Sequence, residues 1–347
     1  MNLQKSTFGL MNDGREAALF TLSNDNGIRI KLTNYGAIIT SIESSDKDGK
    51  SANIVCGFEK LENYLSNEYL GSYPYFGCVV GRFGNRIANG ELTIGGKDCK
   101  LAVNNGPNHL HGGLIGFDKK LWDAEPFEED EKVGIKLSYL SPDGEENYPG
   151  NLKVTCIYSL NNENELGIEY FATTDKTTVV NLTNHTYFNL SGGKGNILNH
   201  ELMLTATEMT EMIEQIPTGK IIPVAGTPFD FTTPKTFNKD ITALPTGYDD
   251  NFVLGNENGE LKFIGFLAEP SLGRKVEIYT TQPGMQLYTG YWIPELEIDG
   301  VKKFGRYSGV ALETQHYPDS VHQPGFPSTE LNPGETYNER TIYKFGV

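Results

Sequence analysis

Short segments in which apolar and polar residues alternate, separated by turn residues, recur along the whole chain. The clearest segments cover residues 27–33, 134–140, 152–160 and 275–281. Each places most of its apolar side chains on one face, as the two-residue period of a strand requires. The joints carry turn pairs such as Asn26-Gly27 and Asp48-Gly49, which are typical of hairpins. The pattern predicts an all-β fold.

Helical periodicity is weak in this sequence. Residues 58–65 are predicted to form a short helix, and the pattern of Thr205–Ile216 fits either a helix or a strand. No flexible linker, repeat of fixed period or low-complexity tract divides the chain, and strand spacing is similar in both halves. We therefore expect residues 1–347 to form a single domain.

The charge balance limits the partners of the chain. With 45 acidic against 29 basic residues, the formal net charge is −16. Nucleic acids and anionic membranes are bound by clustered Lys and Arg, so neither is expected as a partner.

The four cysteines form no C-x-x-C pair and no segment has the length of a membrane span. These features favour a cytoplasmic protein that binds a small neutral molecule.

Glu313 lies in the middle of residues 309–315, which otherwise have the composition of a buried strand. An ionised carboxylate is costly to remove from water, so such a group is paired, protonated or directed into a polar cavity. A cross-strand ion pair with Lys or Arg would explain it without any functional role. For a lone Glu the ion pair is the favoured explanation, and the other polar clusters decide whether a functional cavity replaces it.

Residues 180–190 predict a strand with one polar face. A two-residue period places Asn181, Thr183, His185, Tyr187 and Asn189 together. Amides, hydroxyls, an imidazole and a phenol are the groups that line carbohydrate clefts, whereas an ordinary wet face usually carries Lys, Glu and Ser. A solvent-exposed sheet face with a structural histidine remains the alternative.

A second cluster contains His109 and His111, followed by Gly112-Gly113. Two histidines separated by one residue could ligate a metal, but no H-E-x-x-H motif or Cys partner accompanies them, so metal is the minor hypothesis. Arg82 and Arg86 lie in a Gly-rich stretch without the Gly-Lys-Ser/Thr of a phosphate loop. An arginine that donates to hydroxyls or to a carboxylate fits this stretch better.

Seven motifs in order along nearly the whole chain resemble the aldose 1-epimerase (galactose mutarotase) family. They are Asn85-Arg86-Ile87; His111-Gly112-Gly113 followed by residues 116–122; residues 184–190; residues 216–219; residues 247–252; residues 282–286; and Leu312-Glu313-Thr314-Gln315. The resemblance implies a large antiparallel β-sandwich with few short helices, an open sugar cleft and no metal or organic cofactor. It implies an isomerase of hexose metabolism that interconverts the α and β anomers of aldohexoses such as D-galactose and D-glucose.

The resemblance also implies the roles of individual residues. Glu313 would be the general base and His185 the general acid. The sugar hydroxyls would be held by His111, Arg86, Asn85, Asp249 and Gln286. A carboxylate near an imidazole raises the imidazole pKa, so we expect His185 to carry the proton that the ring oxygen needs.

Several points stay open in the sequence. The preferred sugar, the choice between monomer and homodimer, and the roles of His109, His316 and His322 are not determined. The segment 205–215 departs from the family pattern, so the rim of the cleft is expected to differ there. Three alternatives remain: a hexose-6-phosphate epimerase, a sugar-binding module without catalysis, and a metal-dependent hydrolase that uses the two clustered histidines.

Overall fold

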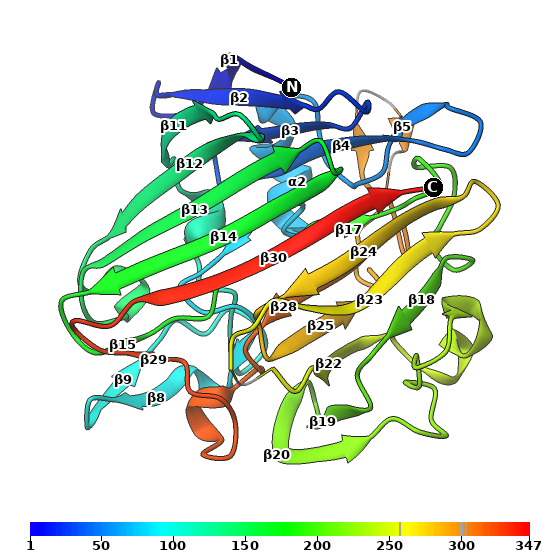
Figure 1. Cartoon of the computed structure of the whole chain (residues 1–347). Coiled ribbons are helices and arrows are strands. Elements are labelled where there is room, and N and C mark those ends of the chain that lie inside the picture. The colour runs from blue at the N-terminus through cyan, green and yellow to red at the C-terminus, as the bar shows by residue number, and fades with distance from the viewer. Residues whose placement is uncertain (257, 299–300, 303) are drawn as a thin grey trace.

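The computed structural model describes residues 1–256, 258–298, 301–302 and 304–347. Three large antiparallel sheets account for most of its strands. The broadest, at the front of Figure 1, has the order β11 (Asp123–Glu128), β12 (Lys132–Ser141), β13 (Leu152–Asn161), β14 (Glu165–Thr174), β30 (Tyr337–Gly346), β24 (Arg274–Thr280), β23 (Lys262–Glu269), β18 (Glu201–Leu204) and β21 (Lys235–Thr236).

The second sheet has six strands, and the third is built from the N-terminal segment. The six-stranded sheet has the order β17 (Tyr187–Phe188), β28 (Val310–Gln315), β25 (Gly284–Tyr288), β22 (Asp249–Val253), β19 (Glu208–Ile213) and β20 (Ile216–Pro223). The five-stranded sheet consists of β1 (Asn2–Leu10), β2 (Glu16–Ser23), β3 (Arg29–Thr33), β4 (Ile39–Ser45) and β5 (Ser51–Asn53) in sequence order.

Short elements complete the described part of the chain. The two-stranded pairs are β7 (Arg86–Ile87) with β10 (His109–Leu110), β6 (Val79–Val80) with β16 (Thr183–Asn184), β8 (Glu91–Ile94) with β9 (Lys97–Lys100), β15 (Thr178–Val179) with β29 (Glu330–Leu331), and β26 (Glu297–Ile298) with β27 (Val301–Lys302). The helices are α1 (Leu61–Tyr64), α2 (Asn67–Ser72) and the 3₁₀ turns Ala88–Gly90, Phe117–Lys119, Glu145–Asn147, Phe237–Lys239, Ile241–Ala243 and Ser320–His322. None of the described helices has the length and apolar character needed to cross a membrane.

One face of the six-stranded sheet packs against the nine-stranded sheet. Leu312 and Leu287 belong to the same buried apolar cluster as Ile278 and Tyr343 of the larger sheet. The Tyr343 hydroxyl donates to the Leu312 carbonyl at 2.9 Å, which joins β30 to β28 directly. The apolar face of β28 is therefore fixed in the core, and its alternate residues point to the opposite face.

The sequence patterns are confirmed for the strands that have clear alternation. The predicted segments 134–140 and 152–160 lie within β12 and β13, and 27–33 and 275–281 overlap β3 and β24. The ambiguous segment 205–216 forms a strand, β19, followed by a turn. The helix expected over 58–65 is limited to one turn, Leu61–Tyr64. The all-β prediction is confirmed.

The expectation of one continuous strand over residues 180–190 is wrong. This segment forms two separate pieces, β16 against β6 and β17 against β28, and all of its residues are buried. The two pieces pair with different strands, and between them the Asn184 side-chain oxygen accepts from the backbone N–H of Thr186 at 3.1 Å. The side-chain amide of Asn181 donates to the backbone carbonyls of Gly84 and His316. The predicted polar face does not exist as a unit.

Candidate active site

A cavity of about 610 Å³ opens on the face of the six-stranded sheet that points away from the core, where chain segments far apart in sequence meet. Its wall consists of Ser72, Tyr73, Pro74, Tyr75, Asn85, Arg86, Asn105, Leu110, His111, His185, Tyr187, Glu214, Gln215, Thr246, Asp249, Tyr288, Trp292, Ile293 and Glu313. The volume lies in the range of small-molecule sites. Six of the seven residues expected to form a sugar site line this one cavity.

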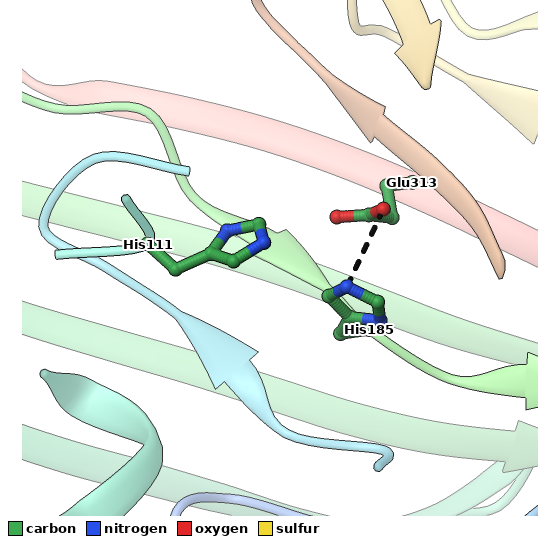
Figure 2. A group of neighbouring side chains, drawn as sticks. All are labelled: His111, His185 and Glu313. Carbon is green, nitrogen blue, oxygen red and sulfur yellow. Dashed lines mark ion pairs between the residues drawn. The ribbon is translucent and has the colours of Figure 1, made fainter. Parts of the chain in front are cut away.

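The centre of the cavity is a carboxylate–imidazole pair. Glu313 Oε1 lies 3.6 Å from His185 Nε2, and the two side chains are only 2% and 4% exposed (Figure 2). Glu313 reaches the cavity because it alternates with Leu312, which is anchored in the core. The partner of the buried carboxylate is thus an imidazole rather than the cross-strand Lys or Arg of the non-functional explanation.

The electrostatics of the pair differ from the sequence expectation. Burial raises the pKa of Glu313 well above its ordinary value, the Asp249 charge raises it further, and Arg86 opposes both. Burial lowers the pKa of His185 to about 3. The pKa of His185 therefore moves opposite to the expected direction, because the loss of water around the ring disfavours the imidazolium. Between the two pKa values, the pair holds one proton in total.

His111 approaches the pair from the end of β10, and Figure 2 shows its ring directed toward His185 and Glu313. Its Nδ1 accepts the backbone N–H of Asn85 at 3.1 Å, so in the neutral ring the proton is on Nε2. Burial holds the pKa of His111 well below its ordinary value. Tyr75 packs against both imidazoles, with ring centroids 4.7 Å from His111 and 5.8 Å from His185. His111 is therefore a neutral hydrogen-bond donor.

Arg86 and Asn85 enter the cavity from β7 and the residue before it. Arg86 Nε donates to Asn105 Oδ1 at 3.0 Å, which fixes the orientation of the guanidinium. The Asn85 oxygen accepts the backbone N–H of Arg86 at 2.9 Å, and the backbone of Asn85 has a φ of 65°. Asparagine tolerates this left-handed conformation better than most residues. The guanidinium of Arg86 is therefore a cation that the cavity wall holds in a fixed orientation.

Asp249 lines the cavity, whereas Gln286 does not. Gln286 Nε2 donates to Asp249 Oδ1 at 2.7 Å from the neighbouring strand β25. Gln215 Nε2 donates to the other oxygen, Oδ2, at 3.0 Å. Gln286 is 1% exposed and lies in register with Glu313 of β28, on the same face of the sheet. The structure thus places Gln286 as a support of Asp249 instead of a member of the cavity wall.

Sequence reasoning missed the aromatic wall and two polar supports. Tyr75, Tyr288 and Trp292 line the cavity, and Trp292 is 62% exposed at its rim. Asn105 and Gln215 hold Arg86 and Asp249. The sequence around these aromatic and polar residues has no period or motif that marks them as part of a site. The exception is Gln215, which lies in the segment that departs from the family pattern.

The remaining histidines do not line this cavity. Nδ1 of His109 is 2.7 Å from the Ala102 carbonyl and Nε2 is 2.6 Å from the Tyr148 hydroxyl, so both ring nitrogens are engaged away from His111. His316 contacts Gln282, and His322 contacts Asp319. The hydrolase alternative, which needs His109 beside His111, is therefore wrong. Among the residues that the structure describes, the group that could hold a metal ion is His111, His185 and Glu313, whose ligand atoms lie within 4.8 Å of one another.

An antiparallel sandwich with a buried carboxylate–imidazole pair in a polar cavity defines an acid–base enzyme that acts on a small polar ligand. Comparison with known proteins gives the particular family. The aldose 1-epimerase family model matches residues 18–344. The chain therefore belongs to the aldose 1-epimerase family, and it is an enzyme of the isomerase class.

Relatives match over their full length. The chain is 43% identical to the galactose mutarotase of Sus scrofa and 41% identical to that of Homo sapiens, in each case covering 100% of this chain and 99% of the relative. It is 34% identical to the aldose 1-epimerase of Escherichia coli K12, covering 98% of both. The crystal structure of galactose 1-epimerase from Lactobacillus acidophilus superposes with a TM-score of 0.85 at 30% identity, covering 99% of this chain and 98% of that one. The sandwich expected from the resemblance is confirmed.

Proposed function

We propose that the chain is an aldose 1-epimerase, or mutarotase, that interconverts the α and β anomers of aldohexoses such as D-galactose and D-glucose. Glu313 acts as the general base and His185 as the general acid. The observation that carries this assignment is the pair itself: two complementary proton-transfer groups 3.6 Å apart in an open cavity. The mutarotase names of the full-length relatives agree with it.

The reaction needs two proton transfers and no net change in protons. Glu313 removes the proton from the C1 hydroxyl while His185 donates a proton to the ring oxygen, and the bond from C1 to the ring oxygen breaks. The aldehyde then rotates about the C1–C2 bond and recloses on its other face. In reclosure the two groups reverse their roles: protonated Glu313 returns a proton to the new C1 oxygen and neutral His185 takes one back from the former ring oxygen.

The burial of the pair favours this cycle. Before ring opening the pair must be a carboxylate and an imidazolium; afterwards it is a neutral carboxylic acid and a neutral imidazole. Burial disfavours both charges, as the opposite pKa shifts of Glu313 and His185 indicate. The neutral form of the pair therefore accompanies the open-chain sugar, the high-energy species of the reaction. This contribution acts on the intermediate more than on the bound ring, which is the condition for catalysis.

The other polar groups would hold the sugar. Arg86 and His111 supply donors and Asp249 supplies an acceptor, while Asn85 lines the wall and bonds to His111 through its backbone N–H. Gln286 would act through Asp249. Ring opening requires only proton transfers, so we propose no metal or organic cofactor. A metal on His111, His185 and Glu313 would occupy both groups that must move protons.

The wall charges favour an uncharged aldose over a sugar phosphate. Among the described residues that line the cavity, Arg86 is the only Lys or Arg. Three of the lining residues, Glu214, Asp249 and Glu313, are acidic. A phosphate group needs clustered cations or backbone donors.

A binding module without catalysis would not need the pair, yet both members face the cavity. The four cysteines are free thiols, which supports a cytoplasmic location; we leave monomer and homodimer both open.

Polarimetry tests the proposal. Freshly dissolved, anomerically pure α-D-galactose, α-D-glucose and pentoses are each followed with and without protein, and the spontaneous rate is subtracted. We expect saturable acceleration for at least one neutral aldose and a much lower kcat/KM for glucose 6-phosphate than for glucose. No acceleration of any aldose would refute the proposal, and a preference for the phosphate would support the hexose-6-phosphate alternative.

A further inference from the structure

The turn between β19 and β20 has residues that its geometry disfavours. Ile213 pairs with Ile216, so the loop consists of Glu214 and Gln215 alone. Their φ angles are 49° and 67°. Two-residue hairpin turns with both residues at positive φ strongly prefer Asn-Gly or Gly-Gly, because a Cβ is crowded in this conformation. This chain therefore tolerates a turn that costs it stability.

A second hairpin in the same chain shows the favoured solution. Between β8 and β9, Ile94 pairs with Lys97, and the two loop residues are Gly95 and Gly96, with φ angles of 54° and 75°. That turn does not border the sugar cavity. Two glycines thus satisfy the same backbone geometry in that hairpin, so the turn alone does not require Glu214 and Gln215, and a contact of their side chains becomes the relevant observation.

The side chain of Gln215 has a defined contact in the cavity. Its Nε2 donates to Asp249 Oδ2 at 3.0 Å, while Gln286 Nε2 donates to Oδ1 at 2.7 Å. The two amides therefore hold the two carboxylate oxygens from different elements, one from the sheet and one from the hairpin turn. With both oxygens held, the remaining lone pairs of Asp249 have a fixed direction for accepting a sugar hydroxyl.

We propose that Gln215 is a positioning residue that fixes the Asp249 carboxylate for one sugar hydroxyl, and that the strained turn is kept for this purpose. The proposal rests on the mutarotase function proposed above. Gln286 alone leaves Asp249 free to rotate about the single bond to its carboxylate; the second amide removes that freedom. Asp249 also adds negative charge near Glu313, so its placement affects the base as well as the binding of the sugar.

Two substitutions separate positioning from a purely structural role. Gln215→Gly relieves the turn but removes the amide, and Gln215→Met keeps the volume but removes the donor. We expect Gln215→Gly to raise Tm while kcat/KM for galactose falls about tenfold or more, the scale of a lost hydrogen bond to a charged group. Gln215→Met should lose kcat/KM similarly without the gain in Tm. Asn147→Gly, which relieves a positive φ of 69° at an exposed residue outside the cavity, is the matched control and should leave kcat/KM unchanged.

Deoxy sugars identify the hydroxyl that Asp249 accepts. The wild type and Gln215→Met are compared on the 2-, 3-, 4- and 6-deoxy forms of the preferred hexose. The penalty of the substitution should disappear for one of them, because that sugar lacks the hydroxyl that the fixed carboxylate receives. An equal loss on every sugar, or unchanged kcat/KM in both variants with an active wild type, would overturn the proposal. An inactive wild type would instead refute the proposed function.

Discussion

Replacing Glu313 by Gln removes the proposed base with little change in shape. The amide keeps the volume of the side chain beside Leu312 and His185 but cannot accept the C1 proton. A general base contributes about 10²–10⁴-fold to rate, which corresponds to roughly 3–5 kcal/mol of transition-state stabilisation. Because the amide also cannot stabilise an imidazolium 3.6 Å away, we expect the loss of kcat/KM in polarimetry to lie at the upper end of that range.

The same substitution should not destabilise the fold. The folded pKa of Glu313 is raised, so wild-type stability falls as the pH rises from the unfolded pKa through the folded one. Gln carries no titrating group, so the Tm of Glu313→Gln should equal or exceed that of the wild type at pH 7, with a smaller difference near pH 4. A variant that folds normally and retains near wild-type kcat/KM would refute the base assignment. A variant that loses activity only through unfolding would refute the burial argument.

Three further predictions concern the pair and the cavity wall. Since burial lowers the pKa of His185 to about 3, the pair takes up a second proton only in strong acid. The acid limb of the pH profile of kcat/KM should therefore lie well below the ordinary imidazole pKa of about 6.5. An acid limb at about 6.5 would contradict a pair that holds one proton. Asn105→Ala removes the acceptor of Arg86 Nε and should raise KM for galactose about tenfold with kcat nearly unchanged; a fall in kcat alone would assign Asn105 another role. Glu214→Lys reverses one wall charge and should increase the kcat/KM ratio of glucose 6-phosphate to glucose, more so at low salt, whereas an unchanged ratio would show that wall charge does not select against phosphate.

Local alternation was a reliable guide where one face of a strand packs on the core. It placed Glu313 opposite Leu312 correctly, because a strand buried on one face must alternate. It failed over residues 180–190, where the two pieces of the segment pair with different strands and the Asn184 side chain bonds to the neighbouring backbone. A side chain that competes for backbone hydrogen bonds removes the period on which the prediction depends.

Spacing alone also could not separate the histidines. His109 and His111 are two residues apart, yet the first bonds to Tyr148 and the second faces His185. The φ of 52° at His111 breaks the regular strand direction there. Similarly, the motif containing Gln286 suggested a sugar contact, whereas in the structure its amide donates to Asp249 and the residue is not part of the cavity wall.

The sequence by itself determined the all-β class, the strands with clear alternation and, through its ordered motifs, the family and six of the residues that line the cavity. Those properties depend on local period and residue identity. Only the tertiary structure decided the directions in which the two pKa values shift and the supports of the site. Glu313 and His185 are far apart in the chain, and their pKa values depend on how much water the other segments exclude. The role of Gln215 likewise arises where a hairpin turn meets a strand that no local pattern connects to it.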